Sequence, residues 1–72
     1  MAFTEATLNA QLDAAATGRT ITLVTFNPGS TNTTIYATGV LAPYAGRSRW
    51  VDVPNSQTAA QAATTIQNAL TT

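Results

Sequence analysis

The sequence contains no cysteine, no histidine and no lysine. Without thiol and imidazole groups the chain cannot form disulfides or a cysteine and histidine metal site, and it lacks the usual nucleophile activators and the commonest general base. Its three carboxylates, on Glu5, Asp13 and Asp52, are too scattered to form a catalytic pair, and no phosphate-binding or calcium-binding loop motif occurs. We therefore predict a protein that is not an enzyme and that uses no metal and no cofactor.

Charge is equally scarce, at 8% of the residues with a formal net charge of zero, against roughly 25% charged residues in an ordinary soluble domain. Surfaces that bind nucleic acids usually carry a basic stripe, so three arginines disfavour such a partner. No stretch reaches the roughly 18 apolar residues of a membrane span, which predicts no membrane partner. The N-terminal stretch has no basic region followed by an apolar run, so we expect no signal peptide and synthesis in a cytoplasm.

The length of 72 residues predicts one domain, residues 1–72. A chain this short buries only about 60% of the surface of its unfolded form, and small domains usually gain further stability from disulfides, a metal or a partner subunit. The absence of cysteine and histidine leaves the partner subunit as the expected source of stability. The fifteen threonines and many alanines predict a surface that packs against copies of itself, or against a larger shell, with little desolvation of charge. These features favour a homo-oligomer or an assembly component over a free monomer.

The first segment, residues 3–18, has the pattern of a helix. Thr4 is a suitable N-cap, and Phe3 can pack on Leu8 as a hydrophobic staple. Gly18 is expected to end the helix, because glycine adopts the left-handed C-cap conformation at little cost. The predicted apolar stripe consists of Leu8, Leu12, Ala15 and Ala16.

Three segments rich in β-branched residues follow, at residues 19–26, 31–41 and 47–53. The first carries apolar groups on both faces, which predicts a central strand or one covered on both sides. The sequence Asn27-Pro28-Gly29-Ser30 predicts a type II turn in which Gly29 has a positive φ. A short turn of this kind joins antiparallel strands, and a similar return through residues 42–46 predicts a three-stranded meander.

The last segment, residues 54–72, predicts a second helix that is capped by Asn55 or Ser56. Its apolar stripe recurs at spacings of three and four and is mostly alanine: Ala59, Ala62, Ala63, Ile66, Ala69 and Leu70. The predicted fold class is thus α+β, a small single domain in the order α-β-β-β-α, with a three-stranded antiparallel meander and both terminal helices on one face.

The stretch GRSRWVDVP, residues 46–54, concentrates two arginines and the tryptophan, and it allows three interpretations. In a strand, alternate side chains share a face, so one face carries Arg47, Arg49, Val51 and Val53. The other carries Ser48, Trp50 and Asp52. The strand could be a protein interface, since arginine and tryptophan are enriched at interface hot spots. It could instead bury Trp50 as the main core residue beneath solvated arginines, or it could contact nucleic acid by phosphate binding and base stacking.

We predict a protein interface formed by Arg47, Arg49, Trp50 and Tyr44. Tyr44, in the loop of residues 42–46, could anchor on a partner, and the alternative is that it folds over the edge of the sheet. Strands with many threonines and few charges are poorly protected against edge pairing, so strand addition between subunits is a natural mode of assembly.

A short chain beginning MAFTEATLNA, with no cysteine or histidine, few charges, abundant threonine and alanine, and an alanine-lined terminal helix resembles the small accessory proteins of tailed bacteriophage virions. These are cement, decoration or other capsid and tail components. The resemblance is one of composition over the whole chain. It implies a structural protein of the virion, assembled in the host cytoplasm, whose partner is itself or a larger capsid or tail protein. The alternatives are a small regulatory or inhibitory protein that binds one protein as a monomer, and a weak nucleic-acid-binding module.

Overall fold

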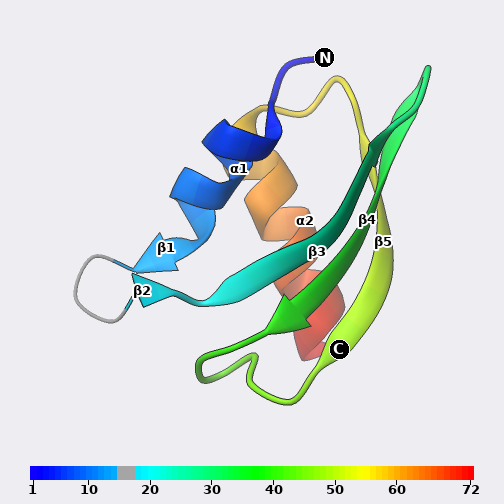
Figure 1. Ribbon diagram of the computed structural model, residues 1–72. Helices are drawn as coiled ribbons and strands as arrows, with labels where there is room; N and C mark the ends of the chain where they lie inside the picture. Colours follow the sequence, from blue (N-terminus) through cyan, green and yellow to red (C-terminus); the bar gives the residue numbers. More distant parts are fainter. Residues whose placement is uncertain (15–17) are drawn as a thin grey trace.

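The computed structural model describes residues 1–14 and 18–72, and it confirms the predicted α+β class. The main sheet is antiparallel with the strand order β3-β4-β5, and a two-stranded antiparallel sheet joins β1 to β2. Both helices lie on one face of the main sheet, and none of the described elements covers the other face (Figure 1). The elements are α1 (Glu5–Leu12), β1 (Asp13–Ala14), β2 (Gly18–Arg19), β3 (Ile21–Pro28), β4 (Asn32–Gly39), β5 (Ser48–Pro54) and α2 (Ala59–Thr71).

The core lies between the helices and the covered face of the sheet. Helix α2 packs chiefly over β5 and α1, whereas α1 also packs on β3. The alanine-rich stripe of α2 is confirmed, because its central members are buried and Ala59 and Ala69 pack against the core. The buried apolar residues are Phe3, Leu8, Leu12, Ile21, Leu23, Ile35, Ala37, Val51, Val53, Ala62, Ala63, Ile66 and Leu70. Neither helix in the described part of the chain has the length and apolar character needed to cross a membrane.

Helix α1 begins as predicted but ends early. The Thr4 hydroxyl accepts a hydrogen bond from the Thr7 N–H at 3.1 Å, and the Thr7 hydroxyl accepts one from the Thr4 N–H at 2.8 Å. This reciprocal cap satisfies two N–H groups that the first turn leaves free. The helix stops at Leu12, so the predicted end at Gly18 is wrong. Two predicted members of its stripe, Ala15 and Ala16, lie outside the described residues.

A local hairpin pairing takes over where α1 ends. Asp13 faces Arg19 in the β1–β2 ladder, and the Arg19 Nε donates to Asp13 Oδ1 at 2.8 Å. The hydrogen bond to the Asp13 carboxylate, and its charge, raise the pKa of Arg19. Gly18 does have a positive φ, of 88°, but it opens β2 and does not cap the helix. The alanine pattern gave no sign of this pairing.

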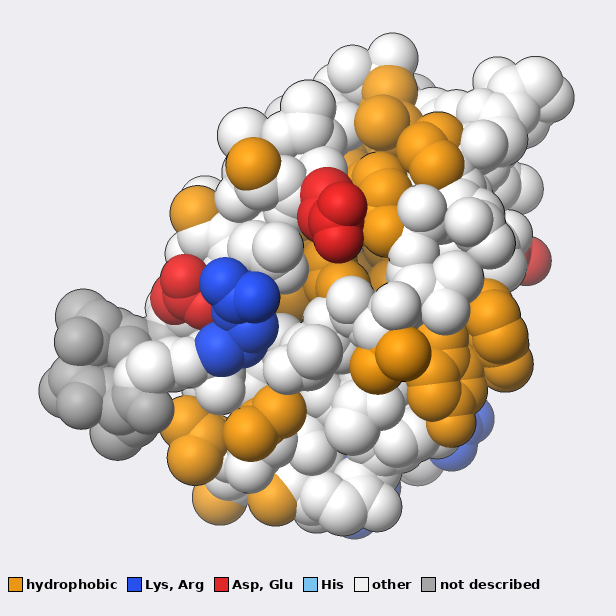
Figure 2. Space-filling model, viewed as in Figure 1, with side chains coloured by type: hydrophobic (Ala, Val, Ile, Leu, Met, Phe, Trp, Pro, Cys, Tyr) orange, Lys and Arg blue, Asp and Glu red, His pale blue; other side chains and the backbone are white. Residues whose placement is uncertain are grey.

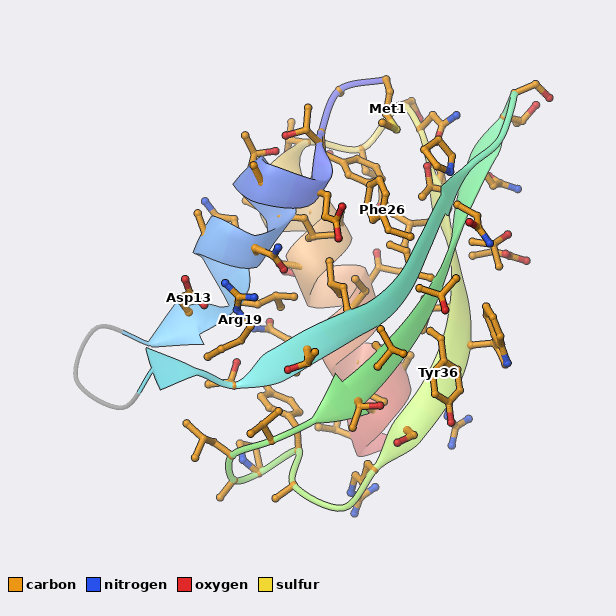
Figure 3. The ribbon with its side chains drawn as sticks, in the orientation of Figure 1. Met1, Asp13, Arg19, Phe26 and Tyr36 are labelled. Carbon is orange, nitrogen blue, oxygen red and sulfur yellow. The ribbon has the colours of Figure 1, made fainter. Side chains whose placement is uncertain are left out.

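Strand β3 is an edge strand, so the prediction of a central or doubly covered strand is wrong. The register slips between Leu23 and Thr25, which places Val24 in a β-bulge, and Val24 is 61% exposed. The bulge reverses the alternation beyond it. Phe26 therefore turns toward the helices, where its ring meets the Phe3 ring edge-on at a centroid distance of 6.2 Å (Figure 3). The bulge explains why both faces of this segment looked apolar.

The turn between β3 and β4 differs from the predicted type II turn. Pairing extends as far as Pro28 with Thr33, and the Gly29 N–H donates to the Asn32 carbonyl at 2.9 Å. Gly29 does not adopt a positive φ. A Cβ at Gly29 would lie 2.5 Å from the Asn32 carbonyl oxygen. Glycine is therefore needed here because the two backbones approach closely.

Helix α2 is capped by Thr58, and the predicted caps Asn55 and Ser56 are wrong. The side chain of Asn55 is occupied elsewhere. Its Oδ1 accepts from the hydroxyl of the fully buried Thr33 at 2.6 Å, and its Nδ2 donates to the Gly29 carbonyl at 2.7 Å. Its backbone N–H donates to Thr31 and its carbonyl accepts from Ala2, at 2.9 and 2.8 Å. Asn55 thus joins the N-terminus, the β3–β4 turn, β4 and the segment after β5.

We predict that Asn55→Asp lowers the free energy of unfolding by about 1–3 kcal/mol. The change preserves size and the acceptor for Thr33, but it sets a carboxylate oxygen against the Gly29 carbonyl where an N–H donated before. Urea unfolding followed by circular dichroism measures the difference. Asn27→Asp, at an exposed position of β3, is the control. Equal stability of the two variants would contradict the role given to Asn55.

Candidate functional site

The uncovered side of the main sheet carries three rows of side chains across its three strands. We call these nine residues the outer face. The register aligns Thr22 with Thr38 and Ser48, Thr25 with Tyr36 and Trp50, and Asn27 with Thr34 and Asp52. Every member is partly or fully exposed. Figure 2 shows hydrophobic side chains gathered over β4 and β5 on this side, with a basic group at their lower margin.

The central row contains an aromatic pair. The rings of Tyr36 and Trp50 lie side by side on adjacent strands, with centroids 4.9 Å apart and planes tilted by 54°. Figure 3 shows the Tyr36 side chain directed away from the helices. Trp50 remains 58% exposed although it contacts Tyr36. A large apolar ring is thus presented to solvent with its orientation supported by a neighbour.

Hydrogen bonds fix the rows on both sides of the aromatic pair. The Thr34 hydroxyl donates to Asp52 Oδ1 at 2.9 Å. On the other side, the hydroxyls of Thr38 and Ser48 lie 3.2 Å apart. These cross-strand contacts order the polar side chains without using long, flexible groups. The outer face is therefore arranged before any partner arrives, and its single formal charge is that of Asp52.

Trp50 does not lie in the core, so the interpretation of Trp50 as the main core residue is wrong. The predicted alternation of this strand is correct, but Val51 and Val53 are the buried members. The physical reason is the polarity of the residues that share each face of the strand. Trp50 shares its face with Ser48 and Asp52, which are polar, while the two valines meet the apolar stripe of α2.

The structure separates the four residues predicted to form the interface. Arg49 belongs to the face opposite Trp50, and its Nη2 donates to the Thr72 carbonyl oxygen at 3.4 Å. Arg47 is exposed just before β5, where its backbone bonds to Gly39 and Tyr44. Tyr44 is half-buried against the core. Trp50 alone lies on the outer face.

The position of Tyr44 depends on a close approach of two backbones. The Tyr44 carbonyl oxygen lies so near Gly39 that any Cβ there would overlap it. This contact holds the loop of residues 40–47 against the end of β4. It also agrees with the alternative in which Tyr44 folds over the end of the sheet and does not project outward.

Tyr36 is a residue of the site that the sequence pattern did not predict. The alternation of β4 already places Tyr36 with Thr34 and Thr38 on one face. The missing information was the register, because the irregular loop before β5 does not reveal from sequence which β5 residue faces Tyr36. Because Tyr36 pairs with Trp50 in the ladder, these two aromatic residues form one cluster.

The chemistry available on the outer face is that of apolar contact and neutral hydrogen bonding. Within residues 1–14 and 18–72, no group of three acidic, histidine or cysteine side chains is placed to hold a metal ion. Arg19 pairs with Asp13 beside β3, away from Arg47 and Arg49 near β5. The arginines of the described residues therefore do not gather into one basic surface.

We predict that Tyr36→Ala and Trp50→Ala are coupled by about 0.5–1.5 kcal/mol in a double-mutant cycle of unfolding free energies. The coupling arises because either change alone already removes the ring contact. Chemical unfolding of the two single variants and the double variant measures it. Trp50→Ala combined with Val40→Ala, at an exposed valine beyond the end of β4, should be additive within about 0.5 kcal/mol. Additivity in both cycles would show that the pair is not an energetic unit.

Comparisons with protein-family models, with curated proteins and with solved structures gave no match for this chain.

Proposed function

We propose that this chain is a non-enzymatic structural protein that acts in assembly, either by self-association or by docking on a larger protein shell. The observation that carries the proposal is the exposed Trp50, packed on Tyr36 at the centre of an uncovered sheet face. Tryptophan and tyrosine dominate the energetics of protein interfaces because they bury a large area with few rotatable bonds. The helices cover the opposite face only, which leaves this one available (Figure 1).

The polar residues around the aromatic pair support a protein partner. They are small hydroxyl and amide side chains with one carboxylate, and the hydroxyls of Thr34 and Thr38 already have partners within the face. Covering such a surface desolvates little charge. A polar rim around an aromatic centre is also the usual composition of an interface.

The setting proposed for this assembly is a bacteriophage virion, as a capsid or tail accessory protein put together in the host cytoplasm. The support is the compositional resemblance together with the charge-poor, threonine-rich surface. A nucleic-acid partner is disfavoured because Arg49 points away from the exposed aromatic rings and Asp52 lies beside them. Phosphate binding next to base stacking would need cations where this face has an anion.

The test is the native molar mass by light scattering after size exclusion, over a hundredfold range of concentration at low and high salt. We expect a mass above the 7.5 kDa of one chain. We expect high salt to leave it unchanged, because screening weakens charge contacts and this face has few. Trp50→Ala should raise the concentration needed for assembly at least about tenfold, the equivalent of about 1.4 kcal/mol.

The control is Val40→Ala, which removes an exposed apolar side chain of similar fractional exposure outside the outer face. It should assemble like the unmodified chain. A mass of 7.5 kDa at every concentration would contradict self-association. That result would favour the alternative of a small regulatory or inhibitory protein that binds one protein partner as a monomer.

A further inference from the structure

Strand β5 has a free edge whose backbone groups can be assigned. Gly39 donates to the Arg47 carbonyl and Asn55 donates to the Thr31 carbonyl, so the odd-numbered residues at both ends of β5 bond toward β4. The register between them is regular. In an antiparallel ladder, alternate residues direct both backbone groups to the same side. The backbone N–H and C=O groups of Ser48, Trp50 and Asp52 therefore point away from β4, to the free edge.

The free edge of β5 differs from that of β3. The β3 edge is interrupted by the bulge at Val24, whereas a terminal proline without an N–H ends both edge strands, Pro28 in β3 and Pro54 in β5. Bulges and prolines are devices that prevent edge pairing. The charges of Glu5, Asp13 and Arg19 also belong to α1 and the β1–β2 hairpin, on the β3 side. Strand β5 has no bulge, and Figure 1 shows no helix or loop beyond it at the margin of the sheet.

We propose that a second copy of this chain pairs its β5 with this β5 in antiparallel fashion, which joins two three-stranded sheets into one of six strands. The inference rests on the proposed function and specifies its partner and its contact. Ser48, Trp50 and Asp52 each direct both an N–H and a C=O to the free edge, and they are spaced symmetrically about Trp50. A two-fold axis at Trp50 matches this set with itself and leaves Pro54, which has no N–H, outside it. The three pairs would exchange about six hydrogen bonds.

The side chains on the outer face are complementary in the same register. Ser48 lies opposite Asp52 of the second copy, so a hydroxyl donor meets a carboxylate at both ends of the contact. Asp52 has a second oxygen free, because Thr34 donates to Oδ1. Trp50 lies opposite Trp50 of the second copy. The two aromatic pairs then form one continuous row across the joined sheets.

Helix α2 also favours a second copy at this edge. A two-fold axis perpendicular to the sheet keeps both helical layers on one side, and α2 is the helix that packs on β5. No residue of α2 is charged. Its threonines at 64, 65 and 71 donate their hydroxyls to carbonyls of their own helix. Two copies of α2 can therefore approach each other without burying a charge or an unsatisfied hydroxyl hydrogen of the helix itself, and Arg49 of β5, which donates to the Thr72 carbonyl oxygen, is the charge on this side.

The area required is available on a chain of this size. A standard interface takes about 800 Å² from each partner, which is about one fifth of the 3952 Å² accessible surface of this chain. The paired strands supply the hydrogen bonds, and the tryptophans and the side of α2 supply contact area. Self-association through β5 leaves most of the outer face uncovered.

The experiment uses the absence of cysteine, so that introduced thiols report only on the contact. Ser48→Cys and Asp52→Cys are made in separate chains, mixed and oxidised. Directly opposite residues of a hydrogen-bonded pair have Cα atoms about 5.5 Å apart, within the range of a disulfide. In the proposed register only the mixed pair is opposite, so it should cross-link at least about tenfold faster than either variant alone. Thr64→Cys on α2 mixed with Asp52→Cys is the control for random collision.

A backbone test accompanies the cross-linking. Asp52→Pro removes an outward N–H without touching the ladder to β4, and it should abolish the dimer, whereas Asp52→Ala keeps the N–H and should retain most of it. Circular dichroism verifies that both variants fold. Faster cross-linking of the mixed pair with loss of the dimer in Asp52→Pro supports the proposal. An unmodified chain that assembles, while the mixed pair cross-links no faster than the single variants, overturns the β5 contact and leaves the proposed function standing. A monomer at every concentration overturns the β5 contact together with self-association, and it leaves docking on a larger shell as the remaining form of the proposed function.

Discussion

The four hydrogen bonds of Asn55 fix the end of the domain at which most of its segments meet. They hold the β3–β4 turn against the segment that leaves β5, so the three strands are tied together at this end of the sheet. They also tie down Ala2, which places Phe3 over the sheet and starts α1 above β3. With α2 starting a few residues after Asn55, both helices are directed to the same face. The exposure of the opposite face follows from this arrangement.

The features that local chemistry controls could be predicted from the sequence. The Thr4 cap, the stripe of α2, and the alternation of β4 and β5 depend on residues within a few positions of one another, and each is present. The strand order of the meander followed from the shortness of its connections. These elements contain strong periodic patterns, and tertiary contacts reinforce those patterns instead of competing with them.

The features that depend on pairing between separate strands could not be predicted. Alanines continue the helical pattern beyond Leu12, but Asp13 is drawn out of the helix by Arg19. The bulge at Val24 reverses which residues of β3 face the core beyond it, and no residue type in this stretch predicts a bulge. The site was affected most: the sequence identified Trp50 but not its partner Tyr36, because only the strand register brings them together. The separation of Arg49 from Trp50, in contrast, follows from the alternation of side chains along a strand, which the sequence already predicted.

A charge-poor domain of this size has two ways to gain stability from a partner, and the structure separates them. The outer face offers side-chain contact around an aromatic centre, while the β5 edge offers backbone hydrogen bonds. The two surfaces meet at Trp50, which has its side chain on one and its peptide groups on the other. A subunit could thus pair through the edge and still present aromatic rings to a larger shell.

The bulge at Val24 has a consequence for the size that such an assembly can reach. A subunit with two regular edges would add neighbours at both ends and could polymerise into a fibre without a natural stopping point. Here one edge accepts a strand and the other is distorted, so sheet extension by β5 pairing terminates at two subunits. In the proposed dimer, one irregular residue on β3 thereby limits strand pairing to two subunits.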